Sequence, residues 1–148
     1  MKTDKAGPSI WARRLGFGGL IPFVCLAGAL WVARSGDWPL ARMSLLGYGA
    51  TIASFLGAIH WGLVMREGSV QPVPSLLWGV VPSLLGWVAL LLGPEPGLLL
   101  IAALIWACFA VDRVWYPRYQ LQAWLPMRLR LTLVASISCL AGAAALLR

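Results

Sequence analysis

The feature that most limits the fold of this chain is a series of five apolar runs, each about as long as a bilayer core is thick. They cover approximately residues 15–33, 43–65, 74–92, 97–114 and 129–147. A helix needs about 20 apolar residues to cross the hydrocarbon core, and within lipid a backbone must satisfy its own hydrogen bonds. The sequence therefore predicts an all-α membrane protein, a compact bundle of five transmembrane helices.

The composition leaves little protein outside the bilayer. Of the 148 residues, 60% are hydrophobic and 11% are charged, whereas about a quarter of a soluble domain is charged. We expect one domain over residues 1–148, with residues 1–14 as a short basic tail. Ala27-Gly28-Ala29 is similar to a signal-peptide cleavage site, but the apolar run continues past it to Ala33. We therefore expect an uncleaved first span.

The longest connection lies between the fourth and fifth runs. Between Pro117 and Pro126 it reads RYQLQAWL, and at helical spacing Leu121, Trp124 and Leu125 share one face. An apolar face opposite polar side chains is typical of a helix that lies in the membrane interface. The sequence thus predicts a short interfacial helix before the fifth span.

The basic residues are distributed unevenly between the two sides of the predicted bundle. With the N-terminus inside, the inner side holds nine of them and the outer side three, Arg34, Arg42 and Arg148. Short cytoplasmic loops are enriched in Lys and Arg, so we expect a cytoplasmic N-terminus and an outer C-terminus. The net charge of +7 does not indicate nucleic-acid binding, because the basic residues flank apolar runs and form no continuous face.

The segment FLGAIHWG, residues 55–62, places the single histidine of the chain inside an apolar run. At about 100° per residue, Gly49, Ala53, Gly57 and His60 fall within roughly 80° of one another. Stripes of small residues allow membrane helices to pack closely, so His60 is expected to face protein. Close packing is also expected at Gly62, at Gly19 and at Pro22, where a kink is predicted as well.

The predicted topology places ionisable residues of different runs at one depth. His60 needs a hydrogen-bonding partner, because lipid provides none. The expected partner is Asp112 near the inner end of the fourth run, with Arg130 or Tyr116 as alternatives. Three interpretations stay open: a structural hydrogen bond, a titrating functional group, and a metal or haem ligand. One histidine and three isolated cysteines do not supply the four ligands of a zinc site, so we expect no metal and no other cofactor.

Further arginines gather at the same predicted inner end of the bundle. They are Arg113, Arg118 and Arg128. Clusters of basic residues beside membrane spans are typical of sites that hold anionic lipid head groups. We therefore expect these three arginines to contact such head groups.

Four motifs together resemble a known family. They are LGFGGLIPF, YGATIASFLGAIHWG, the aspartate before VWYP, and RLRLTL, spread over about residues 15–140. In this order they are similar to the domain of unknown function 3429 family, which includes bacterial inner-membrane proteins and the eukaryotic transmembrane protein 69. The resemblance implies a small multi-pass protein of a bacterial or mitochondrial inner membrane, with no established activity. It draws attention to Gly19, Pro22, Tyr48, Ser54, Gly57, His60, Trp61, Gly62, Asp112, Tyr116, Pro117, Arg130 and Thr132.

Three classes of function fit these observations unequally. We expect a non-enzymatic protein of the bacterial inner membrane that binds another membrane protein or a lipid, because small-residue stripes suit an accessory or assembly role. The alternative is a small proton-coupled carrier or conduit in which His60 and Asp112 titrate. Five spans do not form an even inverted repeat, which argues against a carrier. An enzyme or redox protein acting on quinone is the third class, and no nucleophile, metal set or cofactor motif supports it.

The predicted topology is testable with reporter fusions. A reporter that is active only outside the cytoplasm should be active when it is joined after Arg148, since the basic ends of the spans are retained inside. A cytoplasmic reporter at the same position should be inactive. Activity of the cytoplasmic reporter would contradict the assignment, provided that the fusion leaves the fifth span intact.

Overall fold

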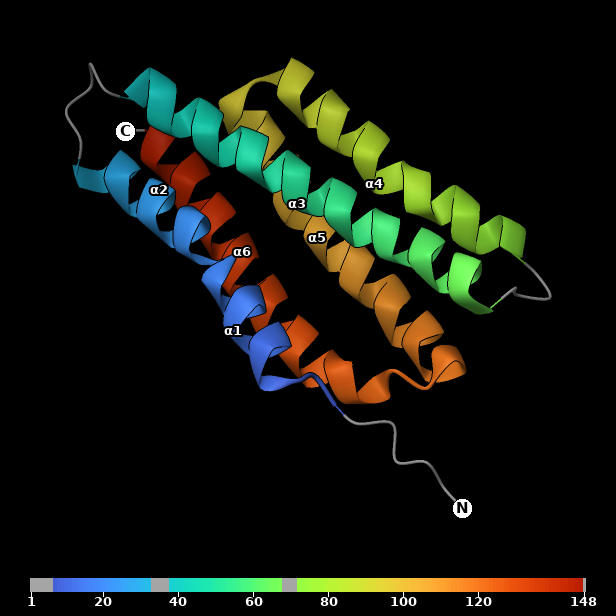
Figure 1. The fold of residues 1–148 in the computed structure, drawn as a ribbon. Helices are drawn as coiled ribbons and strands as arrows, with labels where there is room; N and C mark the ends of the chain where they lie inside the picture. Colours follow the sequence, from blue (N-terminus) through green and yellow to red (C-terminus); the bar gives the residue numbers. More distant parts are fainter. Residues whose placement is uncertain (1–6, 33–37, 68–71, 148) are drawn as a thin grey trace.

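The computed structural model describes residues 7–32, 38–67 and 72–147, and the elements in these ranges are helical (Figure 1). The helices are α1 (Ile10–Gly18), α2 (Ile21–Val32), α3 (Trp38–Glu67), α4 (Pro72–Leu92), α5 (Pro94–Trp115) and α6 (Leu125–Leu146), with two short 3-10 turns, η2 (Tyr116–Tyr119) and η3 (Gln122–Trp124). Five stretches are long and apolar enough to cross a membrane: Ile10–Val32, Pro39–Glu67, Val73–Leu92, Pro94–Tyr119 and Gln122–Leu146. The prediction of an all-α bundle with five candidate spans is confirmed.

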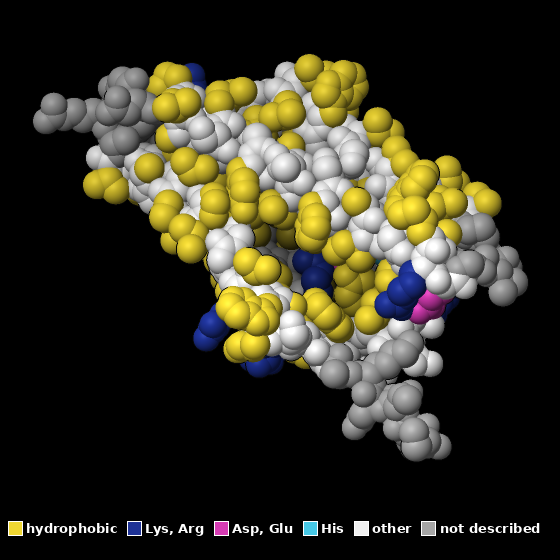
Figure 2. Space-filling view, viewed as in Figure 1, with side chains coloured by type: hydrophobic (Ala, Val, Ile, Leu, Met, Phe, Trp, Pro, Cys, Tyr) yellow, Lys and Arg dark blue, Asp and Glu magenta, His cyan; other side chains and the backbone are white. Residues whose placement is uncertain are grey.

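Helix α3 runs through the middle of the bundle. It packs against α2, α4, α5 and α6, and α6 also packs against α2 and α5. In Figure 1, α1 begins and α6 ends at opposite ends of the bundle. Branched apolar side chains fill the core, among them Leu45, Leu46, Leu98, Ile101 and Ile105. Large apolar side chains also cover much of the outer surface (Figure 2), as expected where lipid chains replace water.

The first helix begins earlier than predicted. Residues 10–14, which the sequence analysis assigned to a basic tail, belong to α1. The Ser9 hydroxyl caps this helix by accepting a hydrogen bond from the Ala12 backbone N–H at 3.1 Å. Arg13 and Arg14 therefore lie on a helix, while residues 1–6 of the predicted tail lie outside the described ranges. The tail prediction was too long because a cap signal was overlooked.

Near the kink predicted at Pro22, the first span is divided into α1 and α2, with Gly19 and Leu20 between them. Pro22 has no N–H to bond the Gly18 carbonyl, and its ring crowds that carbonyl. Beside the break, the Gly19 carbonyl oxygen accepts a hydrogen bond from the Tyr48 hydroxyl at 2.7 Å. The Tyr48 ring also meets Phe23 edge-on, with ring centres 5.0 Å apart. The break is thus joined to the middle of the bundle through α3.

The connection before α6 differs from the predicted interfacial helix. It consists of two separate 3-10 turns, η2 and η3, and contains no α-helix. Gln120 separates them with a φ of 57°, the one left-handed non-glycine conformation in the described ranges. The Gln120 N–H bonds to the Pro117 carbonyl and closes the first turn. Leu121 and Trp124, predicted to share an apolar face, both line a pocket that is described below.

Small residues determine how closely α3 approaches its neighbours. A Cβ added at Gly57 would collide with the Gly79 carbonyl oxygen of α4, so glycine is required at this contact. Gly49 faces α5, where an added Cβ would lie 2.8 Å from Ile101 Cγ2. Ala53 is fully buried between these positions. The predicted stripe of small residues therefore packs against two neighbouring helices, α4 and α5.

Gly62 takes no part in this packing, so the prediction of close packing at Gly62 was wrong. It is exposed, and an added Cβ would meet nothing within 4 Å. Two residues after His60, a helix has turned by about 200°, so Gly62 lies on the opposite face of α3 from the stripe. Nearness in sequence to a packed residue is therefore misleading in a helix.

Gly57 and Gly62 provide a matched pair of substitutions on one helix. Gly57→Ala should lower the free energy of unfolding by about 1–3 kcal/mol, the usual cost of overpacking, because α3 and α4 must separate. Gly62→Ala should leave stability unchanged or raise it by up to about 1 kcal/mol, since alanine favours a helix. Thermal unfolding of both variants in one detergent measures the difference. Equal melting temperatures would contradict the close contact of α3 with α4.

Candidate functional site: a buried ion cluster beside an apolar pocket

Three ionisable side chains meet inside the bundle, and we call them the Asp112 cluster: His60, Asp112 and Arg128. His60 Nε2 lies 3.1 Å from Asp112 Oδ1. Arg128 donates to Asp112 Oδ2 from Nε at 2.9 Å and from Nη2 at 2.7 Å. Because a carboxylate only accepts, the His60 Nε2 carries a proton and donates it. The exposed fractions of the three side chains are 1%, 3% and 9%.

Each member of the Asp112 cluster comes from a different helix. His60 lies on α3, Asp112 on α5 and Arg128 on the first turn of α6. The contact that the sequence analysis expected between His60 and Asp112 is present. A carboxylate at this depth needs a matching charge, because neither lipid nor apolar side chains can solvate it. The cluster therefore ties three helices together at one end of the bundle.

The arginine of the cluster is Arg128, and the prediction of Arg130 was wrong. Arg130 is exposed, because two residues correspond to about 200° of helix rotation. Arg128 was expected to contact lipid head groups, but it is buried against Asp112. The signal that was missed is a stripe on α6 at three- and four-residue spacing, whose buried members include Arg128, Thr132, Ala135, Ser136 and Cys139. Within RLRLTL, that spacing selects the first arginine.

The other predicted residues surround the cluster. Tyr116 is buried and lies beside Arg128 in the wall of a pocket. Arg113 and Arg118 are exposed, and the Arg118 guanidinium lies 4.9 Å from the centre of the Trp115 ring. The exposure of these two arginines is compatible with the expected contact to lipid head groups. Within the described ranges, no three His, Cys, Asp or Glu side chains come together.

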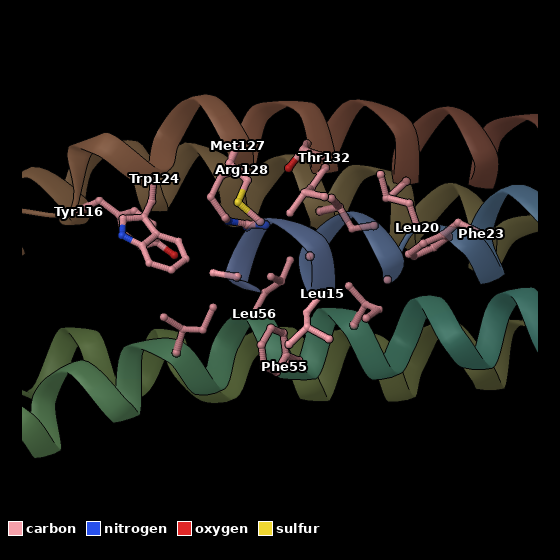
Figure 3. Close-up of a pocket in the computed structure, with 18 of the residues that line it drawn as sticks. Leu15, Leu20, Phe23, Phe55, Leu56, Tyr116, Trp124, Met127, Arg128 and Thr132 are labelled. Atoms are coloured by element: carbon pink, nitrogen blue, oxygen red, sulfur yellow. The ribbon is translucent and has the colours of Figure 1, made fainter. Parts of the chain in front are cut away.

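A largely apolar pocket of about 520 Å³ lies between α1, α2, α3 and α6, with α5 behind it (Figure 3). Tyr116 and Trp124 lie at one end of it, and Leu20 and Phe23 at the other. Figure 2 shows a hollow on the face of the molecule with basic side-chain atoms inside it. Arg128 is the one basic residue in the lining of the pocket. The pocket and the Asp112 cluster therefore share this side chain.

Thr132 also lies in the lining of the pocket. It follows Arg128 by four residues, which places both on one face of α6. Its hydroxyl oxygen is buried and has no hydrogen-bond partner among the described residues. Leaving a buried hydroxyl unpaired costs free energy. Thr132 is 1% exposed, so its hydroxyl lies within the packed wall of the pocket.

The profile of a family described as "Protein of unknown function (DUF3429)" matches residues 8–144. The chain belongs to the DUF3429 family. This DUF3429 protein is also 38% identical over 90 residues to "Transmembrane protein 69" of Xenopus tropicalis. That match covers 60% of the chain and 34% of the frog protein, so the chain spans about a third of its relative's length. No solved structure matches the DUF3429 protein.

Arg128 and Arg130 of the DUF3429 protein provide a test of the cluster. Arg128→Gln should lower the free energy of unfolding by about 3–5 kcal/mol, because Asp112 would keep a buried charge without its counter-ion. Arg130→Gln should change it by no more than about 0.5 kcal/mol, as is usual at the surface. Combining Asp112→Asn with Arg128→Gln removes both charges and should recover part of the loss. Thermal unfolding measures all three, and equal losses for the two single variants would rule out the assignment.

Proposed function

We propose that this protein is a non-enzymatic membrane bundle that holds a lipid chain in the pocket between α1, α2, α3 and α6. The single observation that carries the proposal is the pocket itself. Its volume of about 520 Å³ lies within the range of about 300–1,000 Å³ that is typical of small-molecule sites. The lining includes few residues with polar groups: Arg128 and Thr132 lie on α6, and Tyr116 and Trp124 lie on η2 and η3.

The position of the pocket favours a ligand that comes from the bilayer. Leu15 and Phe55 line the pocket and are also 75% and 62% exposed. They therefore form a rim between α1 and α3 on the side of the bundle. Both residues lie in stretches apolar enough to span a membrane. A hydrocarbon chain can enter at this rim without crossing water.

The distribution of charge supports a place for the pocket in the cytoplasmic half of the membrane. The Trp124 end of the pocket lies where α1 begins and α3 and α5 end (Figure 1). Among the described arginines, Arg42 is the one that lies near the opposite end. By the positive-inside rule, the arginine-rich end faces the cytoplasm, with the N-terminus inside and the C-terminus outside. The turns η2 and η3 then lie at the cytoplasmic interface.

The state of Asp112 supports a non-enzymatic role. Both carboxylate oxygens are engaged, one by His60 and the other by Arg128. A general base must reach the proton that it abstracts, and Asp112 would first have to release a partner. We therefore infer an accessory or assembly role in the bacterial inner membrane, in which the bundle positions a lipid or another membrane protein. Arg113 and Arg118 are available for anionic head groups in this role.

A second candidate function is proton-coupled transport. The observation that favours it is the buried hydrogen bond between His60 and Asp112, because ionisable groups inside membranes often mark proton paths. Proteoliposomes that contain the protein should then conduct protons, and His60→Gln should abolish the flux. Lipid binding requires no such flux.

Filling the pocket tests lipid binding. Ile52 lines the pocket, whereas Leu84 is 56% exposed on α4 and lies outside the lining. Ile52→Trp should remove most of the lipid that co-purifies with the protein, because the indole occupies the space of the chain. Leu84→Trp should retain it. Mass spectrometry of the extracted lipid after detergent exchange measures the difference, and equal lipid content in both variants would contradict the proposal.

A further inference from the structure

We propose that α1 is a hinged lid of the pocket, and that a lipid chain enters and leaves when α1 swings away from α6. This inference rests on the proposed lipid-binding function and adds the route of the ligand and the part of the fold that moves. The structure shows the closed position of the lid. The proposal follows from the shallow packing of α1, from the hinge at one end of it and from the small contact at the other.

Helix α1 is held to the bundle by few side chains. None of its nine residues is buried, whereas α2, the next part of the same span, buries Phe23, Ala27 and Leu30. The main neighbour of α1 is α6. Most of the stability of a helix in a protein comes from packing one face against the rest of the molecule. A segment with few buried contacts opens at a lower free energy than the core, so α1 can move while α2 stays in place.

Helix α1 also forms one wall of the pocket. Ala12, Leu15 and Gly16 belong to the lining, and Figure 3 shows Leu15 between the ribbons of α1 and α3. Leu15 and Phe55 form the rim on the side of the bundle. Because one half of the rim belongs to α1, a displacement of α1 widens the opening toward lipid.

The hinge of the lid lies at Gly18 and Gly19, where α1 ends. Helical hydrogen bonding is weakened there, because Pro22 has no N–H to donate. An added Cβ at Gly18 would meet nothing within 4 Å, so no neighbouring side chain restrains the backbone, which glycine leaves free to rotate. The Tyr48 hydroxyl donates to the Gly19 carbonyl oxygen at 2.7 Å and fixes this point to α3. Helix α1 therefore has a fixed pivot at one end.

The other end of the lid rests on η3. A Cβ built at Gly7, just before α1, would lie 3.6 Å from the Ala123 Cβ, an ordinary van der Waals distance. Within α1, a Cβ at Gly16 would collide with the Cε of Met127 on α6. Small residues and a flexible thioether make up these contacts, and neither of them includes a polar side-chain atom. Opening the lid therefore strands no buried hydrogen-bonding group at these two positions.

The other walls of the pocket are harder to separate. The Asp112 cluster joins α3, α5 and α6 by hydrogen bonds between ionisable groups. Pulling these helices apart would leave a buried charge without its partner, which is costly. Helix α2 is anchored in the core by Phe23 and Leu30. Among the helices that line the pocket, α1 is thus the wall that moves at the lowest cost.

A disulfide between the free end of α1 and η3 tests the lid. The 3.6 Å separation of the two Cβ positions at Gly7 and Ala123 suits a disulfide, in which the Cβ atoms are about 3.5–4.5 Å apart. Gly7→Cys and Ala123→Cys are combined with Cys25→Ala, because Cys25 is exposed while Cys108 and Cys139 are buried. Stopped-flow fluorescence follows the binding of a pyrene-labelled fatty acid methyl ester to the purified full-length variant, oxidised and reduced.

The disulfide should slow both the binding and the release of the probe by at least about tenfold, because a lid controls passage in both directions. The equilibrium affinity should change by less than about threefold, since the locked and the bound states share one position of α1. A simple loss of the site would lower the affinity instead. Reduction should restore both rates, and Gly7→Cys with Cys25→Ala alone should behave as the natural chain under the same oxidation.

Hydrogen exchange gives a second measurement that needs no ligand. In the reduced protein, backbone amides of α1 should exchange at least about tenfold faster than those of α2, because local opening precedes exchange. The disulfide should slow the exchange of α1 and leave that of α2 unchanged. Equal protection of the two helices in the reduced protein would show that α1 does not open separately, and would overturn the lid.

The outcomes distinguish the lid from lipid binding. Equal rates for the oxidised and reduced variants overturn the lid and leave lipid binding in place. Failure of the two cysteines to join shows that Gly7 and Ala123 do not meet, which also overturns the proposed closed position. Failure of the probe to bind the natural chain, or an equal signal from Ile52→Trp, overturns lipid binding itself.

Discussion

The structure depends on pairing one buried carboxyl group, that of Asp112, with two partners inside a membrane-spanning bundle. Asp112 has both oxygens engaged, by Arg128 from α6 and by His60 from α3. Lipid offers no substitute for either partner, so these three helices must meet at this end of the bundle. Arg128 therefore stabilises the fold on one side and forms part of the pocket on the other. Folding and any selectivity of the pocket depend on the same ion pair.

The pocket exists because the first span does not follow α3 along its whole length. Near the middle of the bundle, Tyr48 holds the chain at Gly19. On the other side of the break caused by Pro22, α1 packs against α6. On another face of α3, Gly57 and Gly79 bring α4 close to it. Close contact on one face of α3 and separation on the other leave a single-sided opening toward lipid.

Much of the fold was predictable because lipid restricts the chain so strongly. The runs of apolar residues predict the five spans. The period of the α-helix predicts that His60 and Gly57 face protein. The same helical period shows that two other predicted residues, Gly62 and Arg130, point away from the packed faces. Gly62 and Arg130 are each two residues from a correctly oriented position, His60 and Arg128, and each lies on the wrong face. The early start of α1 could also have been predicted, because its N-cap residue, Ser9, is a typical capping serine.

By itself, the sequence determined the class of protein, the number of spans, and the approximate depth of His60 and Asp112. These properties follow from local composition and from the thickness of a bilayer. Tertiary structure decided which arginine reaches Asp112, which glycines are in contact, and that Thr132 lines a pocket. These depend on the rotation of each helix about its axis and on the separation between helices. Both are set by contacts among residues far apart in the chain, such as Tyr48 with Gly19, which no local pattern encodes.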